Sequence, residues 1–357
     1  MEFSLFNLMT KPADGSTHPE IFEQMRTMTR MVDQAGFDVA WFAEHHLSNY
    51  CISPSPLMTA AHMAAHTSQI KVGPAVVVMP FYEPLRLVED ICLADQLSNG
   101  RLVLGLGTGY QPREFKKFGF EINDRLMRGL EIWDVIQQGL YEGVINYQGQ
   151  HVQIEDAALS IKPVQEKIRT FAVGNAPEMR QKMIDYDAQP LTTPAIGPNA
   201  VIATARRLYK ETRENNGLMG DAFPFAVQRY IYVAENKDDA RKAAEQVLIH
   251  ARMASNMRQS EPAMEGADLK IVPFDKEPDI DVILDRAIIG SAEEVTERIV
   301  SEALEFGITH LSVFMQIASI PFAKTLRSLE SFCDTVMPAV KQQLTEAESE
   351  KLRSCAG

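Results

Sequence analysis

Short apolar stretches alternate with longer stretches of helical periodicity along almost the whole chain, and no other feature restricts the fold as strongly. A repeat of strands and helices requires parallel strand pairing with crossover helices. Eight repeats favour closure into a TIM-type (β/α)8 barrel over an open sheet, so the expected fold class is α/β. The expected strands are residues 3–9, 37–44, 70–80, 101–107, 168–174, 188–194, 223–235 and 308–315, of which 188–194 is placed by the rhythm alone.

The expected helices lie between these strands and after the last one. They cover residues 18–36, 55–67, 84–100, about 123–142, 178–187, 199–215, 237–255 and 291–307, and a last helix ends near residue 343. The helix at 291–307 begins with a Ser-x-x-Glu capping box and ends at a glycine, both typical helix boundaries.

Two segments interrupt the repeat. Residues 144–156 alternate around Gly149, which predicts a hairpin inserted before the fifth strand. Residues 256–281 are polar and rich in proline, which predicts a long, mobile, lid-like loop. We therefore expect one barrel domain over residues 1–345 and a C-terminal tail over residues 346–357.

Charge and composition exclude several classes of function. The chain has 35 Lys+Arg against 48 Asp+Glu, and a net charge of -13 repels the phosphate backbone of nucleic acids. It has no apolar run of the length, about 18 residues, that a membrane span needs, and its N-terminus lacks the pattern of a signal peptide. The four cysteines are widely spaced without a Cys-x-x-Cys pair, which favours a reducing, cytoplasmic compartment.

Three titratable residues, Glu44, His45 and His46, directly follow the second strand. In a βα barrel the active site lies at the C-terminal ends of the strands. Side chains alternate along a strand, so His45 is expected to face away from Glu44 and His46. Two interpretations stay open at this point. The three residues either serve proton-transfer chemistry or form a buried hydrogen-bond network that fixes the strand end.

Two further strand ends are candidate binding loops. In "GLGTGYQPREF" the glycines at 105, 107 and 109 suggest close approach of the backbone to another group. Their spacing differs from the dinucleotide fingerprint, and Pro112 interrupts the place where a helix should start, so a tight loop is the alternative. In "VGNAPEM" (173–179) a strand enters a helix whose N-terminus can bind an anion such as phosphate, or can have an ordinary cap.

No metal site is expected. His62 and His66 lie four residues apart on one helical face, but the residues between them lack the glutamate of the zinc-protease motif. Their alanine-rich helix indicates a packing or interface surface.

Five blocks of sequence together resemble the bacterial luciferase-like flavin-dependent monooxygenases over nearly the whole chain. They are "AWFAEHH", "VGPAVVVMPFYEPLRLVEDICLADQLSNGRLVLGLGTGY", "RGLEIWDVIQQGLYEG", "IGSAEEVTERI" and "DTVMPAVK". The resemblance implies a barrel that binds reduced FMN delivered by a separate NAD(P)H:flavin reductase. Oxygen is the co-substrate and forms a C4a-(hydro)peroxide that oxidises a hydrophobic carbonyl-bearing or long-chain substrate. It also implies a homodimer formed through helices of the second and third units.

The same resemblance assigns roles to residues of this chain. His45 is the expected catalytic group near the flavin, and Glu44 and His46 support it. A cis peptide bond that is not followed by proline is expected between Ala75 and Val76, under the isoalloxazine ring. The residues expected to bind the flavin are Ala75, Val76, Gly107, Thr108, Gly109, Tyr110, Arg125, Gly174, Asn175, Ala176 and Met179, with Arg125 as charge partner of the phosphate.

The chain departs from the light-emitting luciferases at two places. Their Cys-Arg pair after the fourth strand is Gly107–Thr108 here, and their Glu-Ser pair after the fifth is Gly174–Asn175. These differences argue against light emission and remove one arginine from the expected phosphate site. The alternatives are a deazaflavin-dependent hydride-transfer oxidoreductase, where Glu-His-His is not expected, and a non-catalytic flavin-binding protein.

Overall fold

The central strands form a nearly closed barrel, as the repeat of strands and helices predicts. The computed structural model describes residues 1–12 and 14–356. Neighbouring strands are paired in the order β3-β2-β1-β14-β10-β9-β8-β5-β4, and every pair is parallel. The strands are β1 (Glu2–Asn7), β2 (Val39–Phe42), β3 (Lys71–Pro74), β4 (Val77–Val78), β5 (Leu104–Gly107), β8 (Thr170–Ala172), β9 (Gln189–Thr192), β10 (Ala226–Val233) and β14 (His310–Phe314). The sixth expected strand, placed by the rhythm alone, is confirmed as β9.

The third expected strand is divided in two. β3 and β4 are separated by Ala75 and Val76, whose peptide bond is cis as the resemblance implied. β3 pairs with β2 and β4 pairs with β5, and a bridge between Val72 and Leu102 brings the two edges together. The divided strand therefore closes the barrel.

The alternating glycines of β5 and of the loop after it face this divided strand. A Cβ atom at Gly105 would lie 2.3 Å from the carbonyl oxygen of Pro74, and one at Gly107 would lie 2.6 Å from Cγ2 of Val76. At Gly109 it would lie 2.7 Å from Cγ1 of Val78. Larger residues would force the strands apart. The glycines were expected to allow close approach of the backbone to another group, and that group is the neighbouring strand.

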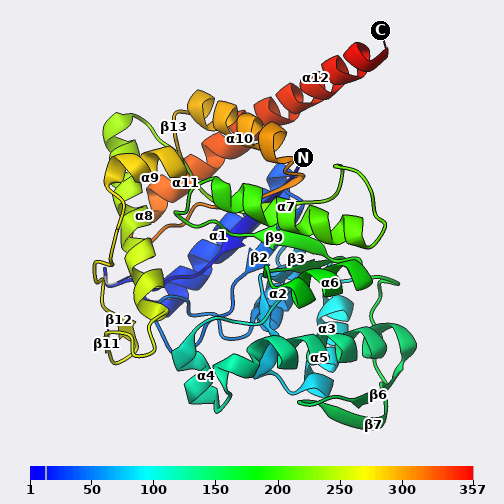
Figure 1. Cartoon of the computed structure of the whole chain (residues 1–357). Helices are drawn as coiled ribbons and strands as arrows, with labels where there is room; N and C mark the ends of the chain where they lie inside the picture. The colour runs from blue at the N-terminus through cyan, green and yellow to red at the C-terminus, as the bar shows by residue number, and fades with distance from the viewer. Residues whose placement is uncertain (13, 357) are drawn as a thin grey trace.

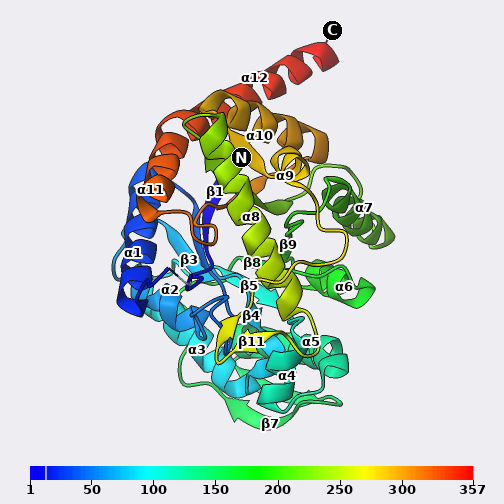
Figure 2. The ribbon, with the colours of Figure 1, turned by 90° about the vertical axis from the view of Figure 1, so that its left-hand side faces the viewer.

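The helices surround the barrel (Figures 1 and 2). They are α1 (His18–Ala35), α2 (Pro56–Ala64), α3 (Pro84–Leu97), α4 (Pro112–Phe118), α5 (Arg125–Gln137), α6 (Pro177–Asp185), α7 (Ala200–Asn215), α8 (Lys237–Met257), α9 (Ile280–Arg286), α10 (Ala292–Phe306), α11 (Phe322–Ser331) and α12 (Met337–Ala356), with short 3-10 or π segments at Met79–Phe81, Ile122–Asp124, Gln138–Glu142 and Phe332–Val336. The expected capping box at Ser291 and the glycine end at Gly307 are both present in α10. Among the described residues, no helix is both long enough and apolar enough to cross a membrane.

Several elements were not predicted. Pro112 begins helix α4 instead of preventing it, because proline suits the first helical position. A short strand, β13 (Ile288–Gly290), pairs with β10 outside the barrel path. α12 runs to Ala356 instead of ending near residue 343, and it projects from the body of the molecule (Figure 1). The last residue of the expected tail, Gly357, lies outside the described residues.

The expected hairpin is confirmed as β6 (Val144–Gln148) and β7 (Gln153–Ala158), an antiparallel pair. Its turn is attached to α5 through the carboxylate of Glu131. That carboxylate accepts hydrogen bonds from the backbone N–H groups of Gln150, His151 and Val152.

The segment 256–281, expected to be a loop, contains a second small hairpin of β11 (Met264–Glu265) and β12 (Asp268–Leu269). Asn49 attaches this hairpin to the loop that follows β2. Its side-chain oxygen accepts from Leu269 N–H at 2.9 Å, and its own N–H donates to the carbonyl of Ala267 at 2.9 Å. Figure 2 shows α8 crossing in front of the strands, with β11 beside its C-terminal end.

Apolar side chains fill the inside of the barrel and form the floor on which a cavity can lie. Trp41 and Phe171 are fully buried and meet edge to face with ring centroids 5.2 Å apart. They belong to a cluster with Val39, Val103, Leu191 and Ala226. The barrel is therefore closed by side chains below and can be open only at the strand ends above them.

Candidate active site

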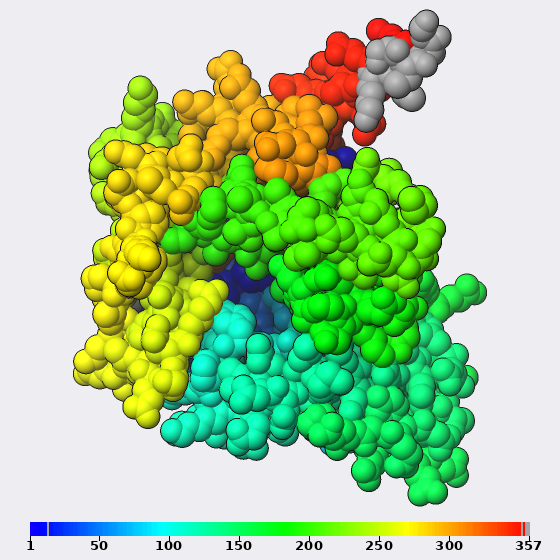
Figure 3. Space-filling view, viewed as in Figure 1, coloured from blue at the N-terminus to red at the C-terminus, as the bar shows by residue number. Residues whose placement is uncertain are grey.

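A cavity of about 450 Å³ lies at the C-terminal ends of the barrel strands. On the face shown in Figure 3 the molecule is hollowed, and the blue surface of early residues is visible at the bottom of the hollow. His45, Glu44 and all the residues predicted to bind the flavin line this cavity: Ala75, Val76, Gly107, Thr108, Gly109, Tyr110, Arg125, Gly174, Asn175, Ala176 and Met179. His46 is the one predicted site residue that does not line it.

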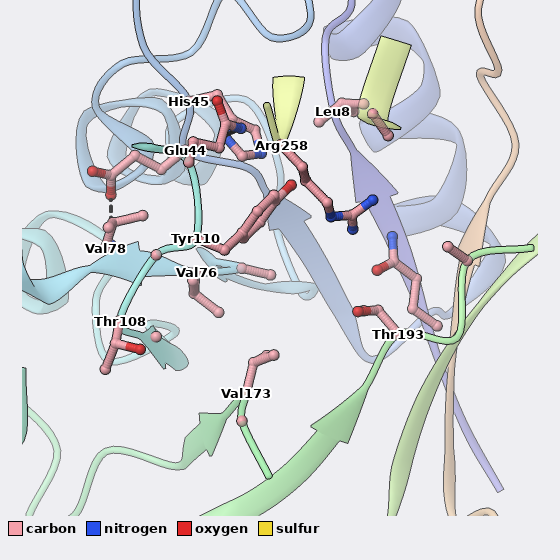
Figure 4. A pocket seen from close by; sticks show the side chains of 18 of the residues that line it. Leu8, Glu44, His45, Val76, Val78, Thr108, Tyr110, Val173, Thr193 and Arg258 are labelled. Atoms are coloured by element: carbon pink, nitrogen blue, oxygen red, sulfur yellow. Dashed lines mark hydrogen bonds between the residues drawn. The ribbon is translucent and has the colours of Figure 1, made fainter. Parts of the chain in front are cut away.

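Glu44 is the centre of a buried hydrogen-bond network. Its carboxylate accepts from the N–H of Val78 at 3.0 Å (Figure 4). It also accepts from the hydroxyl of Tyr82 at 3.0 Å and lies 3.0 Å from Nε2 of His46. Burial raises the pKa of Glu44, and the hydrogen bonds from His46, Val78 and Tyr82 oppose that rise. The network joins the end of β2 to β4, which is the kind of contact that the structural interpretation expects of Glu44 and His46.

His45 lies apart from this network, on the side that faces the cavity. Its Nδ1 is 2.7 Å from the amide nitrogen of Gln111 and 3.4 Å from a carboxylate oxygen of Glu114. The same Glu114 oxygen accepts the backbone N–H of His46 at 2.7 Å. The predicted separation of His45 from Glu44 and His46 is therefore observed, although β2 itself ends at Phe42.

Gln111 and Glu114 were not predicted as site residues. Both lie at the start of α4, where Gln111 is the residue before the helix and Glu114 is in its first turn. Both are buried. The sequence pattern that could have indicated them is the polar pair Gln111 and Glu114 near Pro112, next to the glycine loop.

The predicted anion site at the end of β8 is an uncapped helix N-terminus. α6 begins at Pro177, and within the described structure no side chain caps it, because its N-cap residue is Ala176. The first backbone N–H groups of the helix are therefore free of the usual side-chain acceptor. Arg125 lines the same cavity, half-buried, and donates to the carbonyl of Ile122 at 2.9 Å. An ordinary side-chain N-cap, the alternative, is excluded by this geometry.

A second wall of the cavity was missed by the sequence analysis. It includes Tyr50, Tyr230, His250 and Arg258. The Tyr230 hydroxyl lies 2.7 Å from Nδ1 of His250, and the Tyr50 ring lies against His250 with centroids 5.0 Å apart. Burial, then the charges of His45 and Arg258, lower the pKa of His250 to about 3. The sequence pattern that could have predicted this wall is the spacing of residues 250, 254 and 258, which places them on one face of α8.

The two walls come from different parts of the chain. The wall with the predicted flavin residues consists of residues between 44 and 179. The other wall is formed mainly by residues between 193 and 314, together with Tyr50 and residues of β1 and its following loop. The cavity therefore requires the complete barrel.

The two histidines of α2 do not form a metal site in this structure. The His62 and His66 rings pack against each other with centroids 4.5 Å apart. Within the described part of the chain, no group of three or more His, Cys, Asp or Glu residues is placed to hold a metal ion.

A parallel barrel with a partly polar cavity at the C-terminal strand ends is the arrangement of a barrel enzyme. The sequence model described as luciferase-like monooxygenase matches residues 1–310. The oxygenase component of the flavin-dependent trigonelline monooxygenase of Acinetobacter baylyi is 23% identical over 96% of both chains. The chain belongs to the luciferase-like monooxygenase family and is a flavin-dependent monooxygenase.

Solved structures agree on the fold. Monooxygenase RslO1 from Streptomyces bottropensis has a TM-score of 0.83 at 20% identity, over 95% of this chain and 99% of that one. An F420-dependent secondary alcohol dehydrogenase has a TM-score of 0.74 at 17% identity, over 95% and 98% of the two chains. The barrel alone is thus shared by enzymes with different cofactors.

Proposed function

We propose that this protein is the oxygenase component of a two-component monooxygenase. It takes reduced FMN from a separate NAD(P)H:flavin reductase and uses O2 to oxidise an organic substrate with a carbonyl group or a long apolar chain. The observation that carries the proposal is that His45 and the eleven expected flavin-binding residues, which are distant in sequence, line one cavity. The description of the Acinetobacter relative as an oxygenase component supports a separate reductase.

The residues present fit FMN. Ala75, Val76 and Gly107 form a wall without long side chains, against which a flat ring system can lie. The uncapped N-terminus of α6 provides backbone N–H groups for the phosphate, and Arg125 adds a positive charge. Reduced FMN, when bound, would supply the electrons with which O2 oxidises the substrate.

His45 is the proposed catalytic residue. The side-chain amide nitrogen of Gln111 lies 2.7 Å from its Nδ1, and a carboxylate oxygen of Glu114 lies 3.4 Å from the same atom, so both residues hold the ring in place. The two ring nitrogens of an imidazole can donate and accept a proton, so His45 can act as a proton donor or acceptor at the reacting atoms. Glu44 and His46 fix the strand end that holds it.

Light emission is not part of the proposal. A Cβ atom at Gly107 would lie 2.6 Å from Val76, so a cysteine like that of the light-emitting luciferases would displace the divided strand. The loop after β5 is thus built differently here.

The alternatives are a deazaflavin-dependent oxidoreductase and a non-catalytic flavin-binding protein. The F420-dependent neighbour shares the barrel, and F420 is a deazaflavin. The buried network around Glu44 and the orientation of His45 favour the monooxygenase, because a binding protein has no need of an oriented imidazole.

Anaerobic titration of the full chain with reduced FMN and with reduced F420, followed by air, tests the proposal. We expect reduced FMN to bind at least about tenfold more tightly than reduced F420, and air to give an oxygenated product from a substrate panel. Binding of reduced F420 alone would favour the first alternative. Binding of FMN without any product would favour the second.

We also propose a homodimer in the cytoplasm, with the reductase as a transient partner. Met58 on α2 and Leu97 on α3 are 72% and 61% exposed, and the two helices are neighbours, which gives an apolar surface for a second copy. The free thiols of Cys51, Cys92 and Cys333 agree with a reducing compartment.

A further inference from the structure

One face of α8 forms part of the second cavity wall. His250, Ala254 and Arg258 follow each other at intervals of four residues, and all three line the cavity. Arg258 directly follows the last residue of the helix, Met257. Figure 4 shows its side chain beside Tyr110, on the side of the cavity where Leu8 and Thr193 lie.

Arg258 differs from the other arginines of the cavity. Arg229 is buried and pairs with Glu302 at 2.8 Å. Arg125 is at the start of α5 and donates to the carbonyl of Ile122. The Arg258 guanidinium lies 5.1 Å from the ring centroid of Tyr110, and no carboxylate of the described residues pairs with it. A guanidinium without a counter-ion at a ligand cavity is suited to an anionic ligand.

The groups around Arg258 do not neutralise it. Burial raises the pKa of the Tyr50 and Tyr230 hydroxyls and lowers that of His250 to about 3, so these side chains are neutral at pH 7. Nε2 of His250 is buried and has no hydrogen-bond partner among the described residues. This wall therefore combines one positive charge with aromatic surface.

We propose that Arg258 binds a carboxylate of the substrate, and that the enzyme acts on an organic acid. The apolar body of the substrate lies against Tyr50, Leu8 and Phe314, which line the same wall, and the carbon to be oxidised lies toward His45. This deepens the proposed function, on which it rests, by adding an anionic end to a largely apolar substrate. The phosphate of FMN has its own proposed partners, the N-terminus of α6 and Arg125.

Calorimetric titration of the full chain, with and without oxidised FMN, tests this with three acids and their primary amides. The acids are benzoate, 3-phenylpropionate and octanoate, each matched in shape by its neutral amide. We expect at least one acid to bind about tenfold or more tightly than its amide, because a bidentate guanidinium–carboxylate pair is charge-assisted. Arg258→Gln should remove the preference, and Arg258→Lys should keep part of it. Arg30→Gln on α1, an exposed arginine, is the matched control and should leave the preference unchanged.

Four results would overturn the proposal. They are equal binding of acids and amides, an undiminished preference in Arg258→Gln, failure of all three acids to bind, and a loss of FMN affinity in Arg258→Gln without a loss of acid binding. The last result would assign Arg258 to the flavin. Because the titration without FMN needs neither flavin nor O2, its outcome is separate from that of the anaerobic experiment on the proposed function.

Discussion

The side-chain amide nitrogen of Gln111 lies 2.7 Å from Nδ1 of His45. The two residues are on different loops, after β5 and after β2, so two strand ends cooperate in placing one imidazole. A carboxylate oxygen of Glu114 lies 3.4 Å from the same nitrogen, so two residues at the start of α4 hold the ring. Gln111 is therefore placed to position the imidazole, and His45 is the group that we propose for proton transfer.

His45→Ala should uncouple the enzyme. With a substrate that the wild-type protein oxidises, we expect product formation to fall about 100- to 10,000-fold, the usual contribution of a general acid or base. Oxygen should still be consumed and released as hydrogen peroxide, measured alongside product. His46→Ala is the control: it breaks the network with Glu44 and should lower stability more than coupling. Near-normal coupled turnover of His45→Ala would show that Glu44, His45 and His46 have only a structural role.

Ala176→Asp should stabilise α6 and weaken FMN binding at once. An aspartate at this uncapped N-terminus would accept from the first N–H groups and add about 1 kcal/mol to the free energy of unfolding. Its charge would compete with the phosphate, so FMN affinity should fall about tenfold or more while riboflavin affinity is retained. Ala176→Ser, which caps without a charge, is the control. Equal losses for FMN and riboflavin would mean that the phosphate binds elsewhere.

His250 should make the fold less stable in acid. Its pKa is about 3 in the folded protein against 6.5 in the unfolded chain, because the ring is buried near His45 and Arg258. The unfolded chain takes up this proton first, so the stabilisation is complete above pH 6.5 and is lost as the pH falls toward 3. Between pH 7 and pH 5 this group alone accounts for about 2 kcal/mol.

The control for that pH dependence is His250→Gln, which keeps an acceptor for the Tyr230 hydroxyl but does not titrate. Urea unfolding of both proteins at pH 7 and pH 5 gives the difference. His310, whose pKa is also lowered by burial, contributes equally to both and cancels. If the two proteins lose the same stability, His250 is not neutral in the fold.

Asn49→Ala should release the β11–β12 hairpin. The substitution leaves Leu269 N–H without its acceptor, at a local cost of about 1–3 kcal/mol. Hydrogen exchange in residues 264–269 should accelerate and peroxide leakage should increase, because the proposed lid keeps water from the cavity. Gln259→Ala, an exposed change in the same segment, should alter neither the hydrogen exchange of residues 264–269 nor the peroxide leakage. Unaltered exchange and coupling would show that the hairpin does not close the site.

The double substitution Met58→Asp and Leu97→Asp should yield monomers. Both side chains are exposed and apolar, and charges there would oppose a second copy. Light scattering at micromolar concentration measures the mass of both proteins. A wild-type monomer would contradict the proposed dimer, whereas a double variant that is still dimeric would place the interface elsewhere.

The barrel was predictable because most of its strands are buried on both faces and read as nearly continuous apolar stretches, and the regular alternation then placed β9. β11, β12 and β13 were not, since strands of two or three residues depend on partners such as Asn49 and β10 that lie far away in the sequence. The flavin wall followed from family resemblance. Arg258 could not be found in that way, because its place in the cavity depends on how α8 crosses the barrel.

The separation of the two cavity walls along the chain has an evolutionary consequence. Residues of the first wall, which lie between 44 and 179, can remain nearly constant under selection for the proposed cofactor and reductase. Residues between 193 and 314 can diverge. A change on the face of α8 alone can then alter the substrate specificity of a descendant without altering its redox chemistry. A hybrid that joins the first half of this chain to the second half of a relative should therefore inherit the relative's substrate.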